Sequence, residues 1–185
     1  GVPIWFMIGV LIALSKDICA LKGIQNVDTG NAVMFFYLGT SFGDFMSGYL
    51  SQVFKSRKRI VFLYLIITVI SIPLYLYVTD ITPELFYWVC AFLGIASGYW
   101  AVFVTIASEQ FGTNIRSTVT TTVPNFVRGA LVLLTFILNF FRKSLEIDLI
   151  TSCLIVGILA VGLAFYALSK MEETYHKELN YTEIM

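Results

Sequence analysis

Six apolar runs, each about as long as a bilayer-spanning helix, constrain the fold of this chain more than any other feature. They cover residues 3–21, 31–54, 59–78, 83–111, 117–141 and 147–171. A hydrocarbon core of about 30 Å needs roughly 20 apolar residues in helical form. The alternating pattern of a membrane-spanning β-strand does not occur in the sequence. The sequence therefore predicts an all-α integral membrane protein with a bundle at 1–171 and a C-terminal tail at 172–185.

The composition favours a membrane protein over a soluble helical domain. The 185 residues are 58% hydrophobic and 13% charged, whereas soluble domains carry about 25% charged residues. The formal net charge is zero, so no nucleic-acid partner is expected. The three cysteines lie in apolar runs without the spacing of a disulfide framework or a zinc site. We expect no metal, no cofactor and no enzymatic activity. Because the chain begins at Gly1, we expect a segment of a longer protein.

The basic cluster at residues 55–59, which reads KSRKR, predicts the orientation in the membrane. Lys and Arg gather in cytoplasmic loops. With this cluster inside, the loop at 111–116 and the tail are also inside, and these three segments hold seven basic residues against three on the other side. We therefore expect a multi-pass protein of the plasma (bacterial inner) membrane with a cytoplasmic C-terminus.

The six predicted spans differ in their polarity. Runs 59–78 and 147–171 are apolar on nearly all sides, which is typical of helices that face lipid. The other four carry polar stripes, so we expect them to enclose a polar space. This three-plus-three pattern is typical of transporters built from repeats. Gly39 with Gly43, and Gly94 with Gly98, form small-x-x-x-small pairs that predict close helix contacts.

The run 117–141 carries the most informative stripe. Thr121, Asn125 and Arg128 follow at steps of four and three residues and so share one helix face. Arg128 lies twelve residues beyond Arg116, about 18 Å along a helix and near the midplane. A charge at that depth costs at least about 2.5–3.5 kcal/mol and needs water or an acidic partner. A guanidinium suits an anionic group of a solute; the alternative is an interhelical pair or a clamp on backbone carbonyls. Pro124 is expected to kink this helix.

Two other runs supply further candidate site residues. Ser97 and Trp100 in run 83–111 suit a sugar or organic-acid site, although plain packing explains them equally well. Lys16 in the first run, which would share a helix face with Trp5, is a candidate substrate ligand. Asp17 is a candidate proton carrier if it is buried. The alternative is that Lys16 and Asp17 both reach the membrane interface.

Charged residues also gather at the predicted cytoplasmic ends of the spans. Asp44, Arg57, Glu109 and Arg116 lie there in four different parts of the chain. We expect opposite charges in this position to form a gate or latch that holds one conformation. The alternative is that each one anchors its helix at the membrane interface.

Two segments resemble motifs of the major facilitator superfamily of transporters. Residues 48–58 read GYLSQVFKSRK, which is similar to the basic loop motif G-x-L-(A/S)-D-R-x-G-R-(R/K). Gln52 stands in place of the motif's acid and Lys55 in place of its second glycine. Residues 107–117 read ASEQFGTNIRS, similar to S-E-x-F-P-T-x-x-R-G with Gly112 in place of the proline.

The resemblance covers all six runs, which would be helices seven to twelve of a twelve-helix fold. It implies secondary active transport of a small polar solute, such as a sugar or an organic acid, by rocker-switch alternating access. It also implies proton coupling as a frequent feature, and the N-terminal six-helix half as a partner. Other classes stay open. A six-helix channel would carry Asn-Pro-Ala half-helices and a pump a P-loop, neither of which the sequence has; a non-transporting receptor or scaffold could share the fold.

Overall fold

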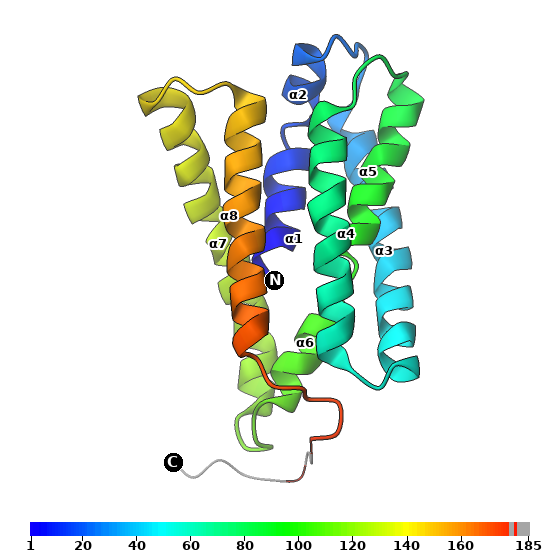
Figure 1. Cartoon of the computed structure of the whole chain (residues 1–185), viewed down its shortest axis with the longest axis vertical. Helices are drawn as coiled ribbons and strands as arrows, with labels where there is room; N and C mark the ends of the chain where they lie inside the picture. The colour runs from blue at the N-terminus through cyan, green and yellow to red at the C-terminus, as the bar shows by residue number, and fades with distance from the viewer. Residues whose placement is uncertain (178–179, 181–185) are drawn as a thin grey trace.

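The chain forms a bundle of upright helices in the computed structural model, which describes residues 1–177 and 180 (Figure 1). Of the described residues, 79% are helical and none lies in a strand. The elements are α1 (Val2–Phe6), the π-helix η1 (Met7–Ile12), α2 (Ser15–Leu21), α3 (Thr29–Val53), α4 (Arg57–Tyr77), α5 (Pro83–Ser97), α6 (Trp100–Glu109), α7 (Arg116–Ser144) and α8 (Leu149–Lys170). The all-α prediction is confirmed.

Four stretches of helix are long and apolar enough to cross a membrane: α4, α5 with α6, α7 and α8. The first segment, α1–η1 with α2, passes only as one span bent by 60°. In the described part of the chain α3 is not among them, although it is 25 residues long. Hydroxyl and amide side chains interrupt its apolar surface.

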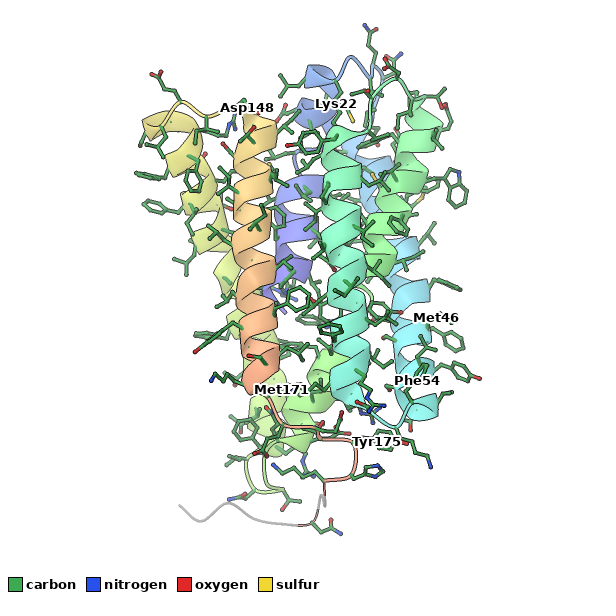
Figure 2. All side chains as sticks on the ribbon, viewed as in Figure 1. Lys22, Met46, Phe54, Asp148, Met171 and Tyr175 are labelled. Atoms are coloured by element: carbon green, nitrogen blue, oxygen red, sulfur yellow. The ribbon has the colours of Figure 1, made fainter. Side chains whose placement is uncertain are left out.

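The two ends of the bundle are distinct. Phe54, Met171 and Tyr175 lie at one end, which we call the tail end (Figure 2). Lys22 and Asp148 lie at the opposite end. The described part of the C-terminal tail crosses beneath the tail end (Figure 1). Residues 178–179 and 181–185 of the predicted tail lie outside the described residues.

Four helices begin at side-chain caps. Asp28, Ser56, Thr82 and Asp148 each accept a hydrogen bond from the backbone N–H three residues ahead, at 2.8 to 3.3 Å. Each cap satisfies one of the N–H groups that a helix start leaves without an intrahelical partner. Pro83 follows Thr82 at the first position of α5, as the sequence predicts.

The contact between α3 and α5 is made by backbone against backbone. A methyl group at Gly94 would lie 2.0 Å from the carbonyl oxygen of Phe36, and one at Gly39 would lie 1.9 Å from that of Ala91. No side chain fits at either position. The predicted role of both glycine pairs in close helix contact is thus confirmed.

Two spans are interrupted, which the sequence analysis did not predict. The first contains η1 and then bends between Ile12 and Ser15. The hydroxyl of Tyr75 on α4 donates a hydrogen bond of 2.8 Å to the carbonyl of Leu11 inside η1. The other break, at Gly98 and Tyr99, separates α5 from α6. Irregular backbone at membrane depth is tolerated where protein buries it or where it lines a cavity.

Helix α7 is the least covered element. It runs unbroken through Pro124, and only Leu134 and Leu138 of its residues are buried. Its polar stripe is exposed, and so are large apolar side chains such as Phe126 and Phe136. Helix α3 likewise exposes a row of large apolar and aromatic side chains: Met34, Tyr37, Leu38, Phe42, Phe45 and Tyr49. Surfaces of this kind are typical of contact with lipid or with another protein.

Candidate functional site

A cluster of two indoles and one guanidinium joins three elements. The Arg128 guanidinium carbon on α7 lies 4.8 Å from the centre of the Trp5 ring on α1. The Trp5 ring meets Trp100 of α6 edge to face, with centroids 6.0 Å apart. Phe103 extends the cluster, 5.3 Å from Trp100. We call Trp5, Trp100, Phe103 and Arg128 the Arg128 cluster.

The two interrupted spans position this cluster. Trp5 lies two residues before η1, and Trp100 opens α6 directly after the break at Gly98 and Tyr99. The indole N–H of Trp5 is buried and has no hydrogen-bond partner among the described residues. A cation over an indole face contributes about 0.5–2 kcal/mol. The Arg128 guanidinium makes no hydrogen bond to the described residues, so its N–H groups can donate to a ligand.

The predicted stripe on α7 leads along the helix to Arg128. The Asn125 side-chain amide donates to the Thr121 carbonyl at 2.9 Å. The Thr121 hydroxyl donates to the carbonyls of Ser117 and Thr118. All three predicted residues are exposed. Arg128 and Asn125 border an open hollow on α7 of about 620 Å³. The stripe therefore presents an amide, hydroxyls and a guanidinium on one accessible face.

Three other predicted site residues lie outside the Arg128 cluster. Ser97 is fully buried between α5 and α3, where its hydroxyl bonds the Thr40 hydroxyl at 2.8 Å and the Gly94 carbonyl at 2.7 Å. Lys16 and Asp17 are exposed on α2, beyond the 60° bend. The π-helix and the bend change the helical register, so the face that Lys16 was predicted to share with Trp5 is not continuous.

A second site lies at the tail end, where Arg57 and Glu109 form an ion pair. Their side chains are only 12% and 11% exposed, and Arg57 Nη2 lies 3.1 Å from Glu109 Oε1. Arg57 Nη1 also donates to the Ser51 hydroxyl at 2.6 Å. The Thr174 hydroxyl donates to the other Glu109 oxygen at 2.6 Å. This group ties the start of α4 to the end of α6 and to the C-terminal tail.

The tail continues this network onto the start of α4. The Glu173 carboxylate accepts hydrogen bonds from the Ser56 hydroxyl and from the backbone N–H groups of Arg57 and Lys58. The Tyr175 ring lies 5.1 Å from the Arg57 guanidinium. Burial by itself would raise the pKa of Glu173, but these hydrogen bonds outweigh it and lower the pKa below its ordinary 4.5. Glu173 therefore binds here as a carboxylate.

The remaining predicted latch residues have other partners. Asp44 on α3 accepts a hydrogen bond of 3.0 Å from the backbone N–H of Ala101, in the first turn of α6. It thus bridges α3 to the element that follows the break. Arg116 donates to the carbonyls of Ser108 and Phe111, at 2.8 and 3.0 Å, and holds the turn between α6 and α7.

Two functional contacts were not predicted from the sequence. The sequence analysis places Glu173 and Thr174 in the tail and predicts no contact for them. An acid and a hydroxyl directly after the last apolar run could have indicated hydrogen bonds to the neighbouring end of the bundle. The sequence contains no local signal for the role of Trp5, because its partner Arg128 lies far from it in the sequence. No cluster of three or more potential metal ligands occurs within residues 1–177 and 180.

Comparison with protein-family models, with curated proteins and with solved structures finds no match to this chain.

Proposed function

We propose that this chain is the C-terminal six-helix half of a secondary transporter for a small polar solute, of the major facilitator type. The observation that carries the proposal is the Arg128 cluster. It joins the Arg128 guanidinium to aromatic rings beside two interrupted helical segments. Interrupted helices near the bilayer midplane are typical of solute sites in transporters.

In this proposal six spans are arranged as three plus three. The bent first segment and α3 are spans in addition to the four apolar ones. The tail end faces the cytoplasm, since seven basic residues belong to the segments at that end. The exposed faces of α3 and α7 contact the N-terminal half, and the outer faces of α4 and α8 contact lipid.

The proposed chemistry at the site is recognition of an anionic or hydroxyl-rich solute. Arg128 offers N–H donors that can bind a carboxylate in a bidentate manner. Trp100 offers a ring face for the apolar side of a sugar or an organic acid. Asn125 and Thr121 add polar contacts on the same face of α7. Asp17 is exposed on α2 and so does not meet the burial that a proton carrier requires.

The proposed mechanism is alternating access by a rocker-switch movement. The Arg57–Glu109 pair and the tail join three segments at the tail end when that side is closed. Opening this side requires some of these contacts to break. Asp44, which links α3 to α6, and Arg116, which holds the α6–α7 turn, stabilise the elements that move.

Transport measured with the whole transporter, in which this chain is joined to its N-terminal half and reconstituted in liposomes, tests the proposal. We expect at least one solute from panels of sugars and organic acids to cross, driven by an imposed pH gradient. Arg128→Ala should lower its kcat/KM about 30-fold or more, because truncating one partner of a desolvated charge pair costs at least about 2 kcal/mol. Arg142→Ala, on the last turn of the same helix, is the matched control and should retain transport.

Two outcomes would overturn the proposed transport, and a third would overturn the proposed role of Arg128. If no solute crosses, the chain belongs to a receptor or scaffold rather than a transporter. If solutes cross without saturation or dependence on the gradient, it belongs to a channel. If uptake saturates but is unchanged in Arg128→Ala, Arg128 is a packing residue over Trp5 and the solute binds elsewhere.

A further inference from the structure

Two hollows lie along the outer side of the α4–α8 pair. The first, of about 340 Å³, is lined by Val69, Ile72, Pro73, Leu154, Gly157, Ile158, Val161, Gly162 and Phe165. The second, of about 420 Å³, is nearer the tail end and is lined by Lys58, Arg59, Phe62, Phe165, Leu168 and Ser169. Phe165 borders both. We call the two together the α4–α8 groove.

The groove is apolar along most of its length. Its first hollow is lined only by apolar residues and two glycines. A methyl group added at Gly162 would meet no atom within 4 Å, so a side chain at this position would extend into the open groove. The absence of a side chain at Gly162 therefore makes the groove deeper. Phe62 and Phe165 meet edge to face, with centroids 5.7 Å apart, where the two hollows join. This surface suits a flexible hydrocarbon chain.

The end of the groove is cationic. Arg59 is exposed, and its guanidinium has no hydrogen-bond or ionic partner in the described part of the chain. Lys58 donates to the Met171 carbonyl at 2.6 Å, which leaves two of its three ammonium N–H groups for another partner. No carboxylate lines this hollow. Both residues lie in the first turn of α4. The Glu173 carboxylate already accepts the backbone N–H groups of Arg57 and Lys58, so the positive charge at this hollow comes from the Lys58 and Arg59 side chains.

We propose that the α4–α8 groove binds one anionic phospholipid from the leaflet at the tail end. Its phosphate contacts Arg59 and Lys58, and one acyl chain passes Phe62 and Phe165. Pro73, the lining residue of α4 farthest from the cationic end, lies fourteen residues beyond Arg59, about 21 Å along the helix, which is half of the roughly 40–45 Å bilayer including its headgroup regions. The groove thus has the depth of one leaflet. The inference requires α4 and α8 to cross a bilayer but does not require transport.

Lipid retention measured by native mass spectrometry tests this site. The purified protein would be mixed with phosphatidylglycerol, with phosphatidylcholine of the same acyl chains, or with inorganic phosphate. We expect phosphatidylglycerol to be retained about fivefold or more over phosphatidylcholine, because each cation near the headgroup contributes about 1 kcal/mol. Arg59→Gln should remove most of this preference and keep phosphatidylcholine retention. Gly162→Phe should lower retention of both lipids.

Arg142→Gln, at the opposite end of the bundle, is the charge control and should behave as the parent protein. Gly129→Phe on α7 is the control for added bulk, since a methyl group at Gly129 also meets no atom within 4 Å. Equal retention of the two lipids by the parent would overturn the proposal, as would unchanged phosphatidylglycerol preference in Arg59→Gln. Binding of inorganic phosphate as tight as that of the lipid would show an anion site without an acyl groove.

Discussion

At the residue scale, Lys55 has a backbone conformation that favours glycine, at the position where the basic loop motif has a glycine. The motif has a glycine where this chain has Lys55, and Lys55 adopts a φ of +48° in the turn between α3 and α4. This left-handed region is open to glycine and costs other residues about 1–2 kcal/mol. The local geometry expected for glycine is therefore present without the glycine.

Lys55→Gly should raise the stability of the protein. Removing the side chain relieves the left-handed strain, and we expect a gain of about 1 kcal/mol in the free energy of unfolding. Thermal unfolding in detergent would measure it. Lys55→Ala is the control, since it removes the same charge but keeps a Cβ. A gain of equal size in Lys55→Ala would assign the effect to charge and not to the backbone.

Glu173 gives the tail contact a pH dependence. Its pKa is below the ordinary 4.5 because, in the folded protein, the Ser56 hydroxyl and backbone N–H groups at the start of α4 donate hydrogen bonds to the carboxylate. The stabilisation is therefore fully present above the unfolded pKa and is lost as pH falls through the lower, folded pKa. A spin label at the exposed position 176 should become more mobile below about pH 4.5.

In Glu173→Gln the same label should be mobile already at neutral pH and should show no acid transition. Glu172→Gln, the exposed neighbour, is the control and should keep the transition. An acid transition that persists in Glu173→Gln would assign it to another carboxyl group.

At the scale of elements, the α3–α5 contact depends on the absence of side chains. Gly94→Ala would place a methyl group 2.0 Å from the Phe36 carbonyl oxygen, so the two backbones must separate. We expect a loss of about 3 kcal/mol or more in stability, the upper range for overpacking. Gly48→Ala on α3, where a methyl group meets nothing within 4 Å, should be neutral or gain up to about 1 kcal/mol.

Thermal unfolding of these two variants in the same detergent makes the comparison. If Gly94→Ala were as stable as Gly48→Ala, the close approach of α3 and α5 would be wrong. The hydroxyl pair Thr40 and Ser97, which lies in the same contact, would then lose its role as an interhelical hydrogen bond.

At the scale of the whole molecule, the Arg57–Glu109 pair should bias which side of the proposed transporter is open. Leaving one member of a buried pair without its partner is costly, about 3–5 kcal/mol. Glu109→Gln should therefore favour the state in which the tail end is open. A cysteine at position 125 should then react about tenfold faster with a membrane-impermeant thiol reagent added from the tail side.

The three native cysteines are buried, so their background reaction should be low. Glu84→Gln, exposed in the first turn of α5, is the control and should leave the rate unchanged. An unchanged rate in Glu109→Gln would mean that the pair stabilises the fold without controlling access.

The helical segments could be predicted from the sequence because their signals are local. The predicted start at Pro83 agrees with the structure, and Ser117 differs from the observed Arg116 by one residue. Caps such as Asp28 and Thr82, together with apolar runs of about 20 residues, act within a few residues of the helix they define. The close helix contacts at the two glycine pairs could also be predicted, because the two glycines of each pair are only four residues apart in the sequence.

Only the tertiary structure decided which polar groups meet. Nothing local indicates that Trp5 lies under Arg128, that Arg57 pairs with Glu109, or that Glu173 caps the start of α4. The breaks at η1 and at Gly98 could not be predicted from the sequence either. The backbone groups that a helix break frees are satisfied by residues distant in the sequence, as Tyr75 does for the carbonyl of Leu11. Local sequence determined the apolar helices and their ends, and contacts between distant segments determined the two sites.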